Sequence, residues 1–401
     1  MRRHRLLAFV LLAAPALVGA EAHAAPTSAQ PFPFELHAKL SGQAPYIVEA
    51  LDVDRDGHVD LVFDRTEGDD DALKWKQGSG NGSFGDSQTI QTWAGREITN
   101  VEVENVDGQL GRDLVVGVSG GEGQAVEVLL RSDSAAFEHV ASLPAASKHF
   151  AMADFSGDGI QDLATAHSEG FTIRPGTGDG TFGAEQVVTV TLPCEEGIGC
   201  LDPVRSLRGL AGGAFVPGNG DDLVARYDNG LATQGGQLLL ASKPGGGFEP
   251  GEFDYGHRGT LDFLLARDLD RDGFLDLIAG GSNAITSPFL YAVYGDASGS
   301  FEEGSGATTM GPEPGILDAD RDGDLDLVSP VADNSPQSGT FTYLEASGRS
   351  FTMIRKGASS SRGAGPVATR DFNEDGWRDF ASTVFGKTPR LTVWLNSSAA
   401  R

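Results

Sequence analysis

Short apolar runs alternate with acidic, glycine-containing loops along most of the chain. The run 46–51 (Tyr-Ile-Val-Glu-Ala-Leu) precedes the first loop, and similar runs begin at Asp60, Asp276 and Asp326 directly after a loop. Runs this short, rich in apolar and β-branched residues and bounded by turn residues, are typical of strands rather than helices. We therefore expect each loop to connect the two strands of a hairpin.

The loops follow a nine-residue pattern, Asp-x-Asp-x-Asp-Gly-x-x-Asp. The pattern is complete at 52–60, 268–276 and 318–326, and the copies at 154–162 and 371–379 carry Ser or Asn in place of the third-position aspartate. Calcium takes about 6 to 8 oxygen ligands, and a tightly curled loop turns alternate side chains toward one point. Glycine at position six permits the positive φ that the sharp turn requires. The pattern therefore predicts calcium loops.

The predicted calcium ligands are the side chains at positions one, three, five and nine and the main-chain carbonyl at position seven. In the five loops these residues are Asp52, Asp54, Asp56, His58 and Asp60; Asp154, Ser156, Asp158, Ile160 and Asp162; Asp268, Asp270, Asp272, Phe274 and Asp276; Asp318, Asp320, Asp322, Asp324 and Asp326; and Asp371, Asn373, Asp375, Trp377 and Asp379. An EF-hand would require glutamate at position twelve, which none of these loops has. We predict about five Ca²⁺ sites that are not EF-hands.

Two further segments match the pattern in part. Segment 105–113 is a weak candidate with Asn105, Asp107 and Asp113 as its ligands, and segment 214–223 retains only Asp222 and the apolar run after it. With these two segments included, position one recurs at seven places spaced by about 50 residues. Repeats of this length predict an all-β fold, a single seven-bladed β-propeller whose blades are four-stranded sheets.

The two ends of the repeat region complement each other. The last repeat ends with the apolar run 391–396 and lacks a fourth strand, whereas 32–40 supplies a strand with no loop before it. We expect this N-terminal strand to complete the seventh blade and close the ring, because closure removes two exposed sheet edges.

With these features the sequence resembles the FG-GAP or VCBS repeat family, whose repeats form the propellers of integrin α-subunits and occur in many secreted bacterial proteins. A second motif also carries the resemblance, a glycine-rich turn and Phe after the third strand of a blade, at 80–85, 178–183, 245–248 and 299–301. The resemblance implies calcium loops on one face of the propeller and a ligand site on the other face or at a blade edge. It does not indicate which residues bind the ligand.

The N-terminus has the features of an export signal. Three arginines among the first five residues precede the apolar run 6–20, and 22–24 (Ala-His-Ala) is a small-x-small cleavage site. This arrangement predicts a signal peptide at 1–24, a propeller domain at 25–401 and a secreted protein, extracellular or, in a Gram-negative source, periplasmic. No cysteine near the cleavage site suits a lipid anchor, and no later apolar run is long enough to span a membrane.

The longest spacing between repeats contains the only two cysteines, Cys194 and Cys200, and we interpret 190–208 as an inserted loop. In an exported protein we expect these cysteines to form a disulfide. Such a bond closes a small loop, so it would stiffen this insertion without holding the domain together.

The chain is strongly acidic, with a formal net charge of −27, and removal of 1–24 leaves 27 basic and 56 acidic residues, or −29. Phosphate binding needs the opposite sign, so we do not expect a nucleic acid partner. Bound calcium would neutralise part of this charge and stabilise the fold. Extracellular modules bind calcium with a Kd of roughly 10⁻⁴ to 10⁻³ M, so filled loops require about millimolar calcium.

A search for catalytic chemistry finds no specific motif. Segment 117–121 matches Gly-x-Ser-x-Gly, but the glycine-rich residues after it predict a blade turn rather than the helix that a nucleophile elbow requires. The histidines form no metal-binding pair, and no zinc, haem or phosphate-binding motif is present. Carboxylate pairs for sugar hydrolysis are too numerous to single one out. We therefore expect a non-catalytic protein.

Tryptophans give the only hint of a sugar-binding surface. Trp75 and Trp394 fall on equivalent third strands and are interpreted as core residues, and Trp93 lies between blades. Trp377, at position seven of the last loop, is the better surface candidate.

Three hypotheses of function follow. The first is a secreted, calcium-stabilised, non-catalytic propeller with an adhesive role, which binds an extracellular glycan or protein at a cell or matrix surface. The second is a multivalent lectin with equivalent sugar pockets on several blades. The third is a calcium-dependent polysaccharide lyase or hydrolase. The sequence names neither the ligand nor the residues that bind it.

Overall fold

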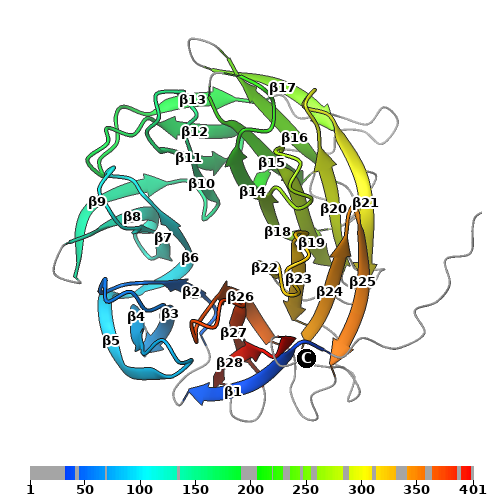
Figure 1. Cartoon of the computed structure of the whole chain (residues 1–401). Coiled ribbons are helices and arrows are strands. Elements are labelled where there is room, and N and C mark those ends of the chain that lie inside the picture. Colours follow the sequence, from blue (N-terminus) through cyan, green and yellow to red (C-terminus); the bar gives the residue numbers. More distant parts are fainter. Residues whose placement is uncertain are drawn as a thin grey trace, which may run out of the picture. The chain divides into compact units, whose positions relative to one another are not determined.

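The computed structural model describes residues 32–40, 45–67, 70–132, 136–190, 206–218, 220–228, 235–243, 247–253, 260–282, 289–308, 313–330, 341–356, 364–385 and 390–398. Over these ranges the regular structure consists of strands, which form seven antiparallel four-stranded sheets. The sheets are arranged as the blades of a seven-bladed β-propeller (Figure 1). The predicted all-β fold and the predicted number of blades are confirmed.

Each blade is a sheet of four strands, and the blades are numbered from β2 onward. Blade 1 is β2 (Val48–Leu51), β3 (Asp60–Glu67), β4 (Asp70–Gly78) and β5 (Phe84–Trp93); blade 2 is β6 (Arg96–Glu104), β7 (Asp113–Gly120), β8 (Gly123–Arg131) and β9 (Phe137–Ala145); blade 3 is β10 (Phe150–Ala153), β11 (Asp162–His167), β12 (Gly170–Arg174) and β13 (Gln186–Thr189). Blade 4 is β14 (Ser206–Gly213), β15 (Asp222–Asp228), β16 (Gly235–Ser242) and β17 (Phe248–Phe253); blade 5 is β18 (Thr260–Arg267), β19 (Asp276–Ser282), β20 (Phe289–Gly295) and β21 (Phe301–Thr308). Blade 6 is β22 (Gly315–Leu317), β23 (Asp326–Pro330), β24 (Phe341–Ser347) and β25 (Ser350–Lys356); blade 7 is β26 (Ala364–Arg370), β27 (Asp379–Val384), β28 (Arg390–Asn396) and β1 (Phe34–Leu40).

The first strand of every blade lies nearest the centre of the ring (Figure 1). The nine-residue loop joins this strand to the second one, as where β18 ends at Arg267 and β19 begins at Asp276. The predicted hairpin role of the loops is thereby confirmed. We call the face that carries these loops the loop face, and the turns between second and third strands lie on the opposite face.

The N-terminal strand closes the ring as expected. β1 pairs antiparallel with β28, and Phe34 stands opposite Asn396. Phe34 is fully buried, and its ring packs edge-on against Phe380 at a centroid distance of 5.0 Å. Aromatic pairs of this kind contribute about 0.5–1.5 kcal/mol beyond the area they bury. The two ends of the described chain are therefore held together by both backbone pairing and side-chain packing.

Hydrophobic core fills the space between neighbouring blades, and position two of each loop points into it. The residues at this position are all buried: Val53, Val106, Phe155, Phe215, Leu269, Ala319 and Phe372. The Phe that opens a fourth strand packs on this position of the preceding blade, as Phe84 does on Phe372 at 5.7 Å and Phe301 on Phe215 at 6.1 Å. The glycine-turn-Phe motif is therefore an inter-blade contact.

The aspartate at position nine is a buried brace in every blade. These residues are at most 2% exposed: Asp60, Asp113, Asp162, Asp222, Asp276, Asp326 and Asp379. In blade 5, Asp276 accepts the N–H of Leu269 on Oδ2 at 2.6 Å and the N–H of Gly295 on Oδ1 at 2.9 Å. The first bond fixes the loop and the second fixes the end of the third strand. Bonds to a charged acceptor are stronger than neutral ones, so we call this arrangement the position-nine brace.

The brace persists in blade 4, where the rest of the acidic pattern is lost. Asp222 accepts the N–H of Val216 at 2.6 Å and the N–H of Ser242 at 2.7 Å. Positions one, three and five of this segment are Ala214, Val216 and Gly218, which offer no carboxylate. The brace therefore forms without a metal loop.

Some predictions fall outside the described residues. The signal peptide at 1–24 and the cysteines Cys194 and Cys200 belong to this part of the chain. β14 begins at Ser206, so 206–208 form part of a strand and not of the inserted loop predicted at 190–208.

Replacement of Asp222 by alanine should test the brace. The change leaves two buried N–H groups without acceptors, and each such group costs about 1–3 kcal/mol, so the free energy of unfolding should fall by roughly 3 kcal/mol. Urea unfolding in calcium and in excess chelator should show equal losses, because no metal loop is present in blade 4. Asp86→Ala, at an exposed position on β5, is the matched control and should be near neutral. A loss confined to calcium would contradict this account.

Candidate metal loops and binding pocket

The acidic loops are curled by their own hydrogen bonds. In loop 268–276, Asp270 accepts the N–H of Asp272 at 3.3 Å, and Asp272 accepts the N–H of Phe274 at 2.9 Å. Asp268 accepts the N–H of Gly273 at 3.0 Å. The same three bonds recur in loops 52–60 and 371–379. Such side-chain-to-backbone bonds stabilise turns, and here they hold positions one, three and five of each loop in one tight curl.

Glycine at position six has the positive φ that the sequence predicts. Examples are Gly57 at 92° and Gly323 at 109°. A side chain with a Cβ atom would be strained there, so these glycines permit the curl that brings the carboxylates together.

An unpaired oxygen at position one is the best evidence that a cation fits these loops. The Oδ1 atoms of Asp52, Asp268, Asp318 and Asp371 are buried, and no described residue donates a hydrogen bond to them. In Asp52 this atom lies 3.7 Å from Nη2 of Arg131, so an ion pair partly compensates its charge. A buried carboxylate oxygen without a donor is costly, and a bound cation would satisfy it. Four of the five predicted loops therefore have a position-one oxygen that a bound cation would satisfy.

Three loops also bring several carboxylates to one point. The groups are Asp52, Asp54 and Asp56; Asp268, Asp270 and Asp276; and Asp318, Asp320 and Asp326, and within each group the candidate oxygens lie within 4.8 Å of one another. Like charges this close repel each other unless a cation binds between them. An all-oxygen donor set suits calcium and other hard cations better than zinc or copper.

The fifth predicted loop, 154–162, and the weak candidate 105–113 satisfy the polar groups at position one themselves. Asp154 accepts the N–H of Gly157 on Oδ1 at 2.7 Å and the N–H of Gly159 on Oδ2 at 2.7 Å, so it has no unpaired oxygen. In the weak candidate loop, Asn105 accepts the N–H of Gly108 at 2.9 Å and donates to the carbonyl of Gln109 at 2.9 Å. We therefore expect the loops that contain Ser156 and Asn105 to bind a cation less readily than the other four loops.

The position-nine carboxylates have a structural role that the sequence analysis missed, since it treated them as ligands only. Burial raises the pKa of Asp276 to about 6 and the pKa of Asp326 to about 7, while the N–H donors of the brace act in the opposite direction. The sequence does carry a sign of this role, because Asp222 is retained in the repeat that lacks the other acidic positions.

Position four of the loops has a left-handed backbone. Among the described residues, every non-glycine residue with a positive φ occupies this position: Arg55, Arg271, Arg321 and Glu374, with φ from 57° to 64°. Two other loops have glycine there, Gly108 and Gly157. A left-handed conformation costs a non-glycine residue roughly 1–2 kcal/mol, so a compensating contact is expected.

The side chain at position four makes this compensating contact with the next blade. Arg271 donates to Asp318 at 3.0 Å, Arg55 donates to the carbonyl of Leu110, and Arg321 donates to the carbonyl of Gly376. Glu374 hydrogen-bonds to His58 across the junction between blades 7 and 1. We call these contacts the loop clasps, and they link each of these loops to its neighbour around the ring. Arginine recurs at position four of three loops, which was the available sequence clue.

The tryptophans occupy mainly the core. Trp75, Trp93 and Trp394 are at most 7% exposed, and Trp394 stacks on Phe380 at 5.6 Å with an interplanar angle of 7°. The core interpretation of Trp75 and Trp394 is confirmed. Trp377 is half-buried, and the guanidinium of Arg321 covers its ring at 4.1 Å, so this ring is not an open stacking platform.

A cavity of about 620 Å³ opens between blades 1 and 2 on the opposite face. Tyr46, Asp64, Asp71 and Arg96 line it, and we call it the inter-blade pocket. Tyr46 is 68% exposed, and its ring lies 5.8 Å from that of Phe385. The volume falls within the range that small ligands occupy.

The polar groups of the inter-blade pocket are fixed by backbone contacts. Asp64 accepts the N–H of Ile47 at 2.6 Å, and Asp71 accepts the N–H of Ile98 at 3.0 Å. Burial raises the pKa of Asp64 to about 6, and the nearby charge of Asp71 adds to this effect. Because these residues come from separate strands and turns, the sequence offered no motif by which to find the pocket.

The Gly-x-Ser-x-Gly segment lies in β7 and its turn to β8, and Ser119 pairs with Glu97 in the sheet. The interpretation of this segment as a blade turn is therefore correct only for Gly121, since 117–120 belong to the strand. The segment is followed by strand β8 and not by the helix that a nucleophile elbow requires.

No protein-family model matches the chain, and no curated protein sequence matches it. An Agrocybe aegerita lectin, described as recognising non-reducing terminal N-acetylglucosamine, is similar in structure, with 15% identity, a TM-score of 0.50, and coverage of 78% of this chain and 80% of that chain. A protein from Lactobacillus plantarum is also similar, with 16% identity, a TM-score of 0.49, and coverage of 82% and 88%. At 15% identity the likeness to the lectin shows the fold alone. Within the described ranges, no helix has the length and apolar character needed to cross a membrane.

Asp320→Ala should separate metal binding from the brace. Asp320 belongs to a convergent carboxylate group, and among the described residues its one hydrogen-bond donor is the N–H of Asp322 at 3.1 Å. At about 10 mM calcium, loss of a site with a Kd near 10⁻⁴ to 10⁻³ M should lower the free energy of unfolding by about 2 kcal/mol. In excess chelator the loss should be small, as should that of Asp54→Ala in loop 52–60. Equal losses in calcium and chelator would show that these loops hold no metal.

Arg321 should report on the loop clasps. Both Arg321→Ala and Arg321→Gly remove the clasp, but only glycine relieves the positive φ, so the glycine variant should be about 1 kcal/mol more stable than the alanine variant. Both variants should shift the emission of Trp377, which Arg321 covers. Thermal unfolding and fluorescence measure the two effects. An alanine variant as stable as the glycine variant would argue against strain at this position.

Proposed function

We propose that this protein is a secreted, calcium-stabilised, non-catalytic propeller that binds a glycan at a cell or matrix surface through the inter-blade pocket. The observation that carries the proposal is the exposed ring of Tyr46 beside the fixed carboxylates of Asp64 and Asp71. An aromatic ring offers an apolar surface for the face of a sugar, and carboxylates accept hydrogen bonds from its hydroxyl groups.

Arg96 adds donors to the same pocket. Its Nη1 donates to Glu127 at 3.2 Å, and its Nε is buried without a partner among the described residues. A pocket with an apolar surface, acceptors and donors in fixed positions has the composition expected of a small-molecule site. The pocket lies on the face opposite the loops, which is one of the places where the family resemblance implies a ligand site.

A single glycan site is favoured over the multivalent lectin. The carboxylate of Asp64 lies four residues after position nine, and the equivalent residues of the other blades lack a carboxylate: Gly117, Ala166, Arg226, Gly280, Pro330 and Thr383. Equivalent pockets on several blades would require such a group to recur. The Agrocybe aegerita lectin shares the fold and is described as recognising a glycan, which supports the ligand class without indicating the sugar.

The proposal also includes calcium bound in the acidic loops and export through the signal peptide. The unpaired oxygens at position one support a cation in the loops, and the predicted signal peptide would deliver the protein to a compartment with about millimolar calcium. The calcium would stabilise the ring, and the ligand would bind on the other face.

A glycan array and a polysaccharide panel, probed in calcium, should show retention of the mature protein on at least one glycan and no release of soluble fragments. Tyr46→Ala should weaken this binding by about tenfold, since loss of an aromatic contact removes about 0.5–1.5 kcal/mol in addition to the area it buries. Leu110→Ala, at an 89% exposed residue of the loop face, is the control and should bind as the wild type does. Released fragments would support the lyase or hydrolase hypothesis instead, and a blank panel would point to a protein partner.

A further inference from the structure

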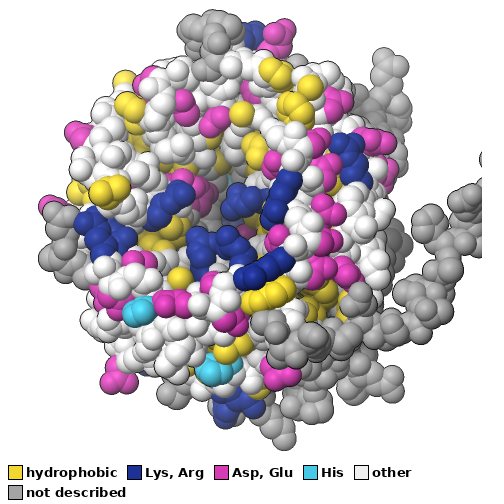
Figure 2. Space-filling view, viewed as in Figure 1, with side chains coloured by type: hydrophobic (Ala, Val, Ile, Leu, Met, Phe, Trp, Pro, Cys, Tyr) yellow, Lys and Arg dark blue, Asp and Glu magenta, His cyan; other side chains and the backbone are white. Residues whose placement is uncertain are grey.

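A second cavity, of about 570 Å³, opens at the central channel on the loop face. We call it the channel mouth. Five arginines line it: Arg112, Arg267, Arg271, Arg370 and Arg378. Figure 2 shows Lys and Arg side chains gathered around a central hollow, with acidic side chains concentrated farther out. This concentration of positive charge is unexpected in a chain with a formal net charge of −27.

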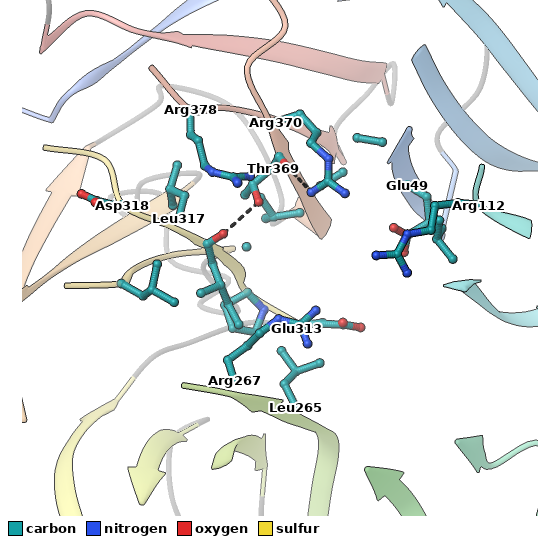
Figure 3. A pocket seen from close by; sticks show the side chains of 18 of the residues that line it. Glu49, Arg112, Leu265, Arg267, Glu313, Leu317, Asp318, Thr369, Arg370 and Arg378 are labelled. Atoms are coloured by element: carbon teal, nitrogen blue, oxygen red, sulfur yellow. Dashed lines mark hydrogen bonds between the residues drawn. The ribbon is translucent and has the colours of Figure 1, made fainter. Parts of the chain in front are cut away.

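The arginines reach the channel mouth from different blades. Arg112 directly precedes β7 of blade 2, Arg267 ends β18 of blade 5, and Arg370 ends β26 of blade 7. Arg378 directly precedes β27, also in blade 7. In Figure 3 the guanidinium groups of these four residues extend toward one shared space. A ligand there would contact several blades at once.

Carboxylates neutralise only some of these arginines. Arg112 pairs with Glu104 at 3.5 Å, and Arg271 pairs with Asp318 at 3.0 Å. Arg267, Arg370 and Arg378 form no ion pair with a carboxylate in the part of the chain that the structure describes. These three arginines therefore keep their charge available for a ligand.

Most of their hydrogen-bond donors are also available. Arg267 donates through Nη1 to the carbonyl of Ala266 at 2.8 Å, and Arg370 donates through Nη1 to the carbonyl of Thr369 at 3.2 Å. A guanidinium has five N–H donors, so each of these contacts leaves several unused. The side chains of Arg267, Arg370 and Arg378 are exposed to the solvent of the channel.

Two further carboxylates line the channel mouth, Glu49 and Glu313. The enclosing channel walls, and next the charge of Glu313, raise the pKa of Glu49 to about 8, so Glu49 is largely neutral at pH 7. The channel walls also raise the pKa of Glu313. Burial, and next the charge of Glu104, raise the pKa of the neighbouring Glu102 of β6 well above its ordinary value. Fully ionised, Glu102 and the four carboxylates of the lining would equal the five arginines in number. The arginines are in excess because the pKa values of Glu49, Glu102 and Glu313 are raised. The local charge is therefore positive.

Acidic residues elsewhere on the protein do little to cancel this charge. The Debye length is about 8 Å at physiological ionic strength, so charges on the outer blades are largely screened from the channel mouth. An anion in the channel would be attracted mainly by the arginines around it.

We propose that the channel mouth binds a small ligand that carries at least two oxyanion groups, held between Arg267 of blade 5 and Arg370 and Arg378 of blade 7. The flat fork of a guanidinium matches the geometry of a carboxylate, sulfate or phosphate and can donate two parallel hydrogen bonds to it. Two such groups are needed because the cations stand on separate blades. This site lies on the loop face and is independent of the glycan pocket proposed above.

The test measures binding by calorimetry at about 5 mM calcium, a concentration that fills extracellular-type loops. The probes are trigalacturonate for carboxylates, glucose 1,6-bisphosphate for phosphates and sucrose octasulfate for sulfates, with maltotriose as the uncharged control. At least one charged probe should bind with a Kd below about 100 µM, and salt raised to about 500 mM should weaken it strongly. Which probe binds most tightly identifies the oxyanion.

The double variant Arg267→Gln/Arg370→Gln should weaken this binding by about tenfold or more, because it removes charge-assisted hydrogen bonds to the ligand. Arg378→Gln, a single change at an exposed residue, should weaken it to a lesser degree and guards against misfolding of the double variant. The control Lys148→Gln/Arg390→Gln makes the same change of charge at exposed residues of the opposite face and should have no effect. Tyr46→Ala should leave anion binding unchanged.

The proposal is overturned if no charged probe binds, or if the control variant loses as much affinity as the channel variants. Unchanged binding in both Arg267→Gln/Arg370→Gln and Arg378→Gln would overturn it as well. Glycan retention that depends on Tyr46 would survive any of these results, so failure of this proposal is distinguishable from failure of the proposed function.

Discussion

The buried carboxylate at position nine is the constraint on which the propeller depends. This side chain lies on the second strand and accepts hydrogen bonds from the start of the loop and from the end of the third strand. A single residue thus links the loop after the first strand to the second and third strands. Burial of this carboxylate costs free energy because it removes a charged group from water. The two N–H donors offset that desolvation cost only while the blade is intact. Each blade is therefore held by an interaction between chain segments far apart within the repeat. The acidic pattern of the loops is separate from this brace, because blade 4 lacks the pattern and still forms.

Arginine side chains lie between neighbouring acidic loops, whose carboxylates would otherwise repel each other. Arg271 and Arg55 extend from one loop onto the next, and Arg349 pairs with Asp270 at 2.9 Å and with Asp272 at 3.3 Å from the neighbouring blade. Exposed pairs of this kind contribute little individually, but a ring of them reduces the repulsion between adjacent loops. Arginines of the protein thus act on the same carboxylates that we propose as calcium ligands, so bound calcium would share these carboxylates with arginines from neighbouring blades.

The repeat pattern predicted the architecture, because strand and turn preferences recur in register through seven copies. Ring closure also followed from the sequence, since one end lacked the strand that the other end supplied. The two roles of position nine could not be separated, because a ligand and a brace require the same residue; only the altered repeat around Asp222 distinguishes them. The inter-blade pocket and the channel mouth were missed for a different reason. Tyr46, Asp71, Arg267 and Arg370 are distant in sequence, and only the closed ring brings such residues together.

The pairing of β1 with β28 also constrains the order of assembly. Six blades are built from strands that are consecutive in the chain, so their contacts are local and can form as soon as those strands are present. The seventh joins residues from opposite ends, such as Phe34 and Asn396, and cannot form before both are free to meet. The entropic cost of closing a loop grows only logarithmically with loop length, so the long separation between β1 and β28 costs little stability. It affects mainly when the seventh blade can form. Until that last pairing, the growing domain is an open arc with two unpaired edges, and its vulnerability to wrong partners is greatest at that stage.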